Sequence, residues 1–100
     1  MITHADIDNR ILRMVRLCVE KIEQDNRLLA QVWRNVDRIA DPRIREEWRS
    51  FRDLPWGDLR TKLLEHGPEG DQLRQNAPLG GILSNRERIG FFQPNLQKVS

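Results

Sequence analysis

The sequence predicts an all-α protein, and two observations support that fold class. Residues 5–40 contain neither glycine nor proline, and apolar side chains recur through them at helical spacing. In the rest of the chain the β-branched residues do not alternate with polar ones, so no strand is predicted. We therefore expect one long N-terminal amphipathic helix over about 5–40, with three to four shorter helices packed back on it.

Apolar residues in the long stretch follow a heptad spacing. Alternate steps of four and three residues from Ile11 meet an apolar side chain at every position except Asp25. Such a seam is typical of a helix that packs along its length on another helix. Further apolar residues flank the seam and widen it beyond what a two-stranded coiled coil needs. We therefore expect two neighbours, the C-terminal half of the same chain and a second copy in a helical homodimer.

A polar run at residues 23–27 permits a second interpretation, in which two shorter helices form a hairpin. All five residues of the run are polar and would suit a loop. However, the heptad spacing continues from Ile22 to Leu29 without a slip, which a continuous helix must preserve and a loop need not. We therefore favour one helix over residues 5–40 and keep the hairpin as its alternative.

A second helix is predicted directly after the long one. Asp41 is a good N-cap, and Pro42 suits the first position of a helix, so a new helix begins there and runs to about residue 53. Three large apolar residues at i, i+4 and i+7 give it one apolar face: Ile44, Trp48 and Phe51.

Three shorter helical segments follow this second helix. A third helix is predicted over about 58–66, between a Pro-Trp-Gly turn and the stop at Gly67, and a helical turn over 70–76. Ser84, with glutamate three residues later, has the capping-box pattern and opens a last helix to about residue 92. We expect one domain over residues 1–100, with a polar tail after about residue 94.

Composition predicts an ordered cytoplasmic protein. Hydrophobic residues make up 38% of the chain and charged residues 32%, which is polar but well patterned. No apolar run approaches the ~20 residues of a membrane helix, and the N-terminus lacks the basic and apolar regions of a signal peptide. We expect no association with a membrane. A single cysteine also fits a reducing compartment.

No pattern in the sequence indicates catalysis. The two histidines, His4 and His66, lie far apart in the sequence, and with one cysteine they do not make a usual zinc site. The glycines at 80 and 81 lack the Gly-Lys-Ser/Thr ending of a phosphate loop. We therefore expect no enzyme activity, no cofactor and no metal.

Protein interaction is the function that the sequence favours. A wide apolar seam, three tryptophans and many arginines are typical components of interfaces. We expect a small inhibitor, adaptor or accessory factor of a larger bacterial or phage machine, whose partner the sequence does not identify. The predicted dimer or partner interface is the part of the seam expected to stay uncovered: Ile11, Val15, Cys18 and Ile22.

Nucleic-acid binding is the alternative function. Arginine makes up fourteen of the seventeen basic residues, and its guanidinium binds phosphate in a bidentate manner. Arg45, Arg49 and Arg52 form a row on the second predicted helix, which makes them the predicted patch for an anionic partner. The net charge of only +2 and the acidic residues between the arginines argue against this alternative.

Overall fold

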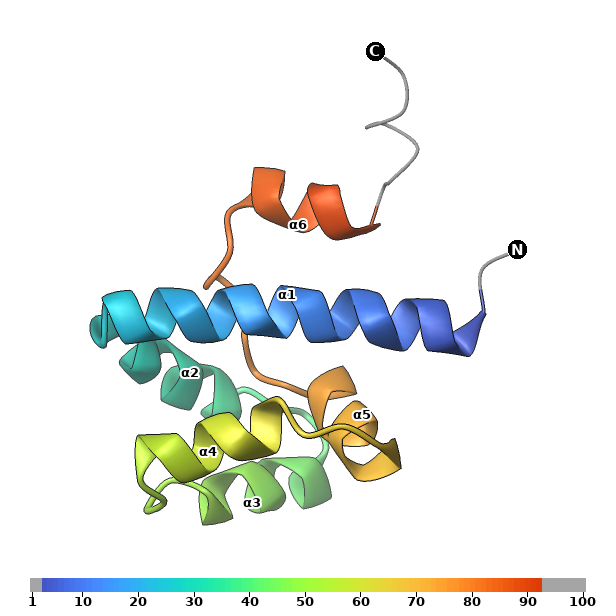
Figure 1. The fold of residues 1–100 in the computed structure, drawn as a ribbon. Helices are drawn as coiled ribbons and strands as arrows, with labels where there is room; N and C mark the ends of the chain where they lie inside the picture. Colours follow the sequence, from blue (N-terminus) through green and yellow to red (C-terminus); the bar gives the residue numbers. More distant parts are fainter. Residues whose placement is uncertain (1–2, 93–100) are drawn as a thin grey trace.

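The computed structural model describes residues 3–92, and within them it contains six helices and no strand (Figure 1). Figure 1 shows α2 to α5 gathered on one side of α1, with α6 on the opposite side. The predicted all-α fold class is therefore confirmed for this part of the chain. The helices are α1 (His4–Gln24), α2 (Arg27–Asp37), α3 (Pro42–Ser50), α4 (Trp56–Leu63), α5 (Pro68–Gln75) and α6 (Asn85–Phe92).

Residues 5–40 form a helical hairpin, so the prediction of one continuous helix was wrong. α1 ends at Gln24, the backbone of Asp25 is extended with φ −144° and ψ 95°, and α2 begins at Arg27. The Asp25 carboxylate accepts one hydrogen bond from the backbone N–H of Arg27 at 3.1 Å and another from its guanidinium at 2.9 Å. Aspartate favours turns because its side chain can bind the backbone two residues later. The alternative break near 23–27 is therefore the observed one.

The apolar faces of α1 and α2 meet in a single core. Six of their residues are at most 3% exposed: Val15, Cys18, Val19, Ile22, Val32 and Val36. The heptad spacing crosses the turn because two separate helices turn their apolar faces to the same core. It was therefore no evidence for one continuous helix.

α3 begins as predicted and ends earlier. Asp41 caps it, because its carboxylate accepts a hydrogen bond from the backbone N–H of Arg43 at 2.8 Å. The last helical residue is Ser50, three residues before the predicted end. Trp48 is 1% exposed and packs edge-on against Phe51, with 5.5 Å between the ring centroids. The predicted apolar face thus joins α3 to the core.

A buried arginine holds the junction between α4 and α5. Arg74 is 3% exposed, and its Nη1 donates hydrogen bonds to the carbonyls of Leu63 at 3.0 Å and Glu65 at 2.6 Å. Its Nη2 binds the Asp71 carboxylate at 2.6 Å. The carbonyls at the end of a helix lack partners within the helix, and Arg74 supplies them for α4. Gly70 permits this packing, since a Cβ there would lie 2.0 Å from the Glu65 carbonyl oxygen.

The predicted capping box opens α6. The backbone N–H of Ser84 donates to the Glu87 carboxylate at 3.0 Å, and the N–H of Glu87 donates to the Ser84 hydroxyl at 3.2 Å. Glu87 also forms an ion pair with Lys21 of α1 at 2.5 Å. Ile89 of α6 is 45% exposed and lies outside the core. The predicted tail after residue 94 lies outside the described residues.

Candidate binding groove between α3, α4 and α5

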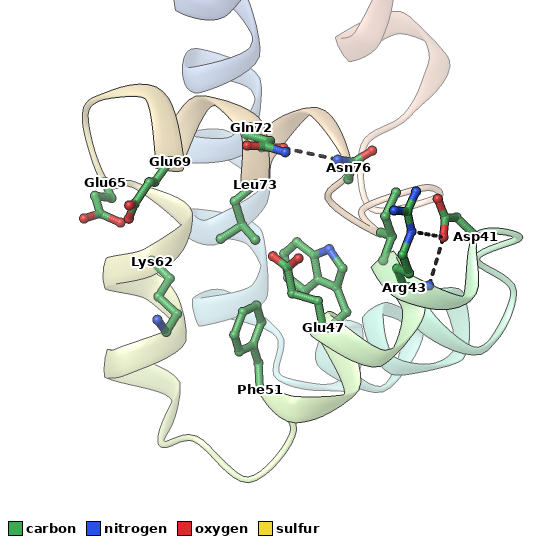
Figure 2. Close-up of a pocket in the computed structure, with 12 residues that line it drawn as sticks. Asp41, Arg43, Glu47, Phe51, Lys62, Glu65, Glu69, Gln72, Leu73 and Asn76 are labelled. Carbon is green, nitrogen blue, oxygen red and sulfur yellow. Dashed lines mark hydrogen bonds and ion pairs between the residues drawn. The ribbon is translucent and has the colours of Figure 1, made fainter.

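A hollow of about 540 Å³ lies between α3, α4 and α5, and we refer to it as the α3–α5 groove (Figure 2). Its volume is within the range of about 300–1,000 Å³ that is typical of ligand pockets in proteins. Its apolar lining consists of Ile44 and Trp48 from α3, Phe51 directly after α3, and Leu73 from α5. The groove therefore has an apolar floor, made of residues that are distant in the sequence and that the fold brings together.

Helical spacing places the apolar side chains of the floor. Ile44 and Trp48 share one face of α3, Phe51 follows directly after the last helical residue, and the buried ring of Trp48 links that face to the core. Ile44 and Phe51 are only half-buried, as is Leu73 of α5. Figure 2 shows Phe51 and Leu73 pointing into the space between the three helices. A partner side chain that enters there would remove apolar surface from water on both sides.

The rim of the groove is acidic, although the whole chain carries a net charge of +2. Glu47 lies on α3, and Glu65 and Glu69 lie on the other side, at the end of α4 and the start of α5 (Figure 2). None of these three glutamates forms an ion pair with any described residue. Four acidic lining residues against two basic ones give the groove a net charge of −2.

The two basic side chains of the groove both have partners within it. Arg43 lies 3.8 Å from the Asp41 carboxylate, a pair that is exposed to solvent. Lys62 of α4 places its ammonium 5.2 Å from the centroid of the Phe51 ring, which is a cation–π distance. A positive charge is therefore already accommodated above the floor of the groove.

The chemistry of the groove is suited to binding. Its charged lining residues are four carboxylates and the cationic side chains of Arg43 and Lys62, which surround the apolar floor. An apolar centre with a charged rim is the usual arrangement of a protein-binding surface.

The residues predicted as a dimer or partner interface lie elsewhere, and most of them are covered. Val15, Cys18 and Ile22 are 0%, 1% and 3% exposed within the core of the chain itself, and Ile11 is half-buried. The turn at Asp25 folds α2 onto α1, and α5 and α6 also pack on α1. These side chains therefore offer a partner little surface. Burial also raises the pKa of the Cys18 thiol to about 11, so it remains a neutral thiol.

The predicted arginine row does not form one free patch. Arg45 donates a hydrogen bond from Nη1 to the Ile39 carbonyl at 3.0 Å, which braces the connection between α2 and α3. Arg49 binds the carboxylates of Glu46 at 2.9 Å and Asp37 at 3.1 Å. Arg52 lies beyond the end of α3 and is exposed, without an ion pair among residues 3–92. Two of the three arginines therefore act within the chain.

Three other arginines line a second hollow, of about 550 Å³, which we refer to as the basic hollow. Arg10, Arg13 and Arg16 come from one face of α1, and His66 joins them from the α4–α5 connection. None of these arginines has an ion pair in the part of the chain that the structure describes. Their spacing of three residues places the arginines on one side of a helix, whereas nothing in the sequence indicates that His66 lies beside them.

Residues 3–92 contain no group of three or more His, Cys, Asp or Glu side chains that could hold a metal ion. None of the described helices is both long and apolar enough to cross a membrane. The chain matches no protein-family model, no curated protein and no solved structure.

Proposed function

We propose that this chain is a non-catalytic protein-interaction module that binds a partner protein in the α3–α5 groove. The observation that carries the proposal is the combination of half-buried apolar residues on the floor with rim glutamates that form no ion pair among residues 3–92. Buried aromatic anchors at the centre of an interface supply most of its binding free energy, while charges at its edge set specificity and association rate.

Such a module acts by occupying a surface of its partner or by joining two partners. The roles that fit are a small inhibitor, an adaptor or an accessory factor of a larger machine. A homodimer stays a prediction, and three of the residues predicted for its interface, Val15, Cys18 and Ile22, are buried in the chain's own core. Among the residues whose burial the structure describes, the large apolar ones that remain exposed are Ile7 and Ile89, at 41% and 45%.

A retention experiment with a matched control tests the proposal. The immobilised chain is incubated with extract of the cells that naturally express it, beside the variants Leu73→Glu and Ile89→Glu. Leu73 lines the groove, whereas the exposed Ile89 lies on α6 and outside it. We expect the wild type and Ile89→Glu to retain the same protein in stoichiometric amount, and Leu73→Glu to lose it.

Circular dichroism and thermal unfolding establish that Leu73→Glu is folded in this experiment. Retention of the same protein by the folded Leu73→Glu variant would contradict the proposal, because the groove would then be irrelevant. Recovery of no stoichiometric protein by the wild type would contradict it as well.

Nucleic-acid binding is the second candidate, and the basic hollow is the observation that favours it. Titration of a labelled DNA duplex at low and high salt measures the contribution of phosphate contacts, because each neutralised phosphate steepens the salt dependence. We expect this candidate, if correct, to show binding that weakens steeply with salt and further on changing Arg10, Arg13 and Arg16 to alanine. Arg52→Ala is the control, since Arg52 is exposed and lies outside the hollow. Salt-insensitive or absent binding would exclude the candidate.

A further inference from the structure

We infer that the partner segment held by the α3–α5 groove is an amphipathic helix in which lysine or arginine side chains flank large apolar anchors. The inference rests on the proposed function and specifies the chemistry of its partner. Three features of the groove support it: the apolar floor, the acidic rim on both sides, and the position of Lys62.

The walls of the groove favour a helix over an extended segment. All three walls are helices, whose backbone N–H and C=O groups are bonded within the helices, so the groove offers no strand edge to pair with. An extended peptide would find no strand edge there and would depend on water and on the exposed Gln72 and Asn76 amides for its backbone hydrogen bonds, whereas a helix satisfies its own backbone groups. A helix in a groove presents anchors at i, i+3 or i+4, and i+7, and the floor offers such anchors the apolar side chains of Ile44, Phe51 and Leu73.

The rim favours a cationic partner. Glu47 lies on one side of the floor, and Glu65 and Glu69 lie on the other, so both flanks of a bound helix would face carboxylates (Figure 2). None of the three is neutralised by an ion pair within the described part of the chain. Lysine or arginine on the flanks would supply the missing charges, whereas the phosphates of a nucleic acid would be repelled.

Lys62 already occupies the place where a cation of the partner would bind. Its ammonium lies over the Phe51 ring, 5.2 Å from the ring centroid, and both residues line the groove. Removal of this side chain would expose the ring and change the net charge of the groove from −2 to −3. Lys62→Ala should therefore bind a cationic helix more tightly, by about threefold to tenfold. A gain in affinity is a result that misfolding would not produce.

A displayed library of random helical 18-residue peptides tests the inference with the full chain as bait. We expect enriched peptides to carry lysine or arginine on both sides of apolar residues spaced at i, i+3 or i+4, and i+7. One enriched peptide is then synthesised, and its affinity for the wild type and for variants is measured by calorimetry at low and high salt.

Charge reversal on the rim is the decisive comparison. Glu65→Lys with Glu69→Lys should weaken binding of the peptide by about tenfold or more at low salt, since two attractions become repulsions. Glu20→Lys with Asp53→Lys is the matched control, because it changes the net charge equally at two exposed carboxylates outside the groove. The control should alter the affinity by less than about threefold.

The results separate the inference from the function on which it rests. Enrichment of acidic or uncharged peptides that still bind the groove would overturn the inference and leave the proposed function standing. Cationic peptides that bind both double variants equally would also overturn it. Self-association of the chain that is lost in Glu65→Lys with Glu69→Lys, measured by light scattering, would show a second copy as the occupant instead. Enrichment of no peptide at all would contradict both proposals.

Discussion

The α1–α2 hairpin and the α3–α5 groove are both built from amphipathic helices, yet one apolar surface is closed and the other is open. On the hairpin, Val15 and Val36 are at most 1% exposed, because the rest of the chain covers them. In the groove, Phe51 and Leu73 are only half-buried. The difference shows that the width of an apolar stripe does not identify a binding surface. What matters is how much of that stripe the chain itself covers.

The largest effect on the free energy of unfolding is expected at a residue that belongs both to the closed core and to the open groove. Trp48 is 1% exposed and also lines the groove, so Trp48→Ala removes core packing together with the groove floor. We expect a loss of about 3–5 kcal/mol in the free energy of unfolding, measured by urea denaturation. The control is Phe51→Ala, at the half-buried residue that directly follows α3. An equal loss in both variants would show that the groove floor is as closed as the core.

A smaller effect on the free energy of unfolding is expected at the junction between α4 and α5, which positions one wall of the groove. A Cβ at Gly70 would lie 2.0 Å from the Glu65 carbonyl oxygen, so Gly70→Ala must displace α5 from the α4–α5 connection. We expect a loss of about 1–3 kcal/mol in the free energy of unfolding.

Gly57 of α4 provides the matched control, since a Cβ there would meet no atom within 4 Å. Gly57→Ala should be neutral or stabilising by about 0.5–1 kcal/mol, because alanine favours a helix more than glycine does. A neutral result for Gly70→Ala would show that the junction tolerates movement and that the groove wall is not fixed by it.

The smallest effect on stability is expected away from the groove, at the ion pair between Lys21 of α1 and Glu87 of α6. Lys21 lowers the pKa of the Glu87 carboxyl to about 2, with a further contribution from the Ser84 backbone N–H. A lowered pKa in the folded state gives stability that is present above the ordinary value of 4.5 and is lost as pH falls through about 2. Glu87→Gln keeps an acceptor for the capping box and removes the charge.

Urea midpoints measured between pH 7 and pH 2 test this pair. The wild type should be more stable than Glu87→Gln at pH 7, and the difference should shrink between pH 4.5 and pH 2. Glu20→Gln, at an exposed carboxylate without an ion pair among the described residues, should show little difference at any pH. A difference in urea midpoint between wild type and Glu87→Gln that stays constant from pH 7 to pH 2 would mean that the charge of Glu87 contributes nothing to stability.

Local patterns made much of the fold predictable. Thr3 and Asp6 form the capping box at the start of α1, Asp41 caps α3, and Ser84 with Glu87 opens α6. Each cap depends on residues two or three positions apart, so its chemistry is visible in the sequence. The apolar face of α3 was predictable for the same reason.

Interactions between distant segments were not predictable from such patterns. Asp25 occupies a heptad position, and only the bonds it makes to Arg27 show that it ends a helix. Arg74 looked like one of many surface arginines, yet it is buried against carbonyls nine and eleven residues earlier. The groove combines α3 with two later helices, so no pattern in the sequence predicted that Glu47 and Glu69 would both line it.

The Arg74 junction also reduces the conformational entropy that the groove would lose when a partner binds. Arg74 holds the main-chain carbonyl of Glu65, and Gly70 lets α5 pack directly against that carbonyl, so one wall of the groove is fixed through its backbone. A preorganised wall loses little conformational freedom when a partner binds. The carboxylates of Glu65 and Glu69 project from this wall without taking part in its support. Substitutions at these two positions can therefore redirect the choice of partner while the scaffold that presents them stays intact.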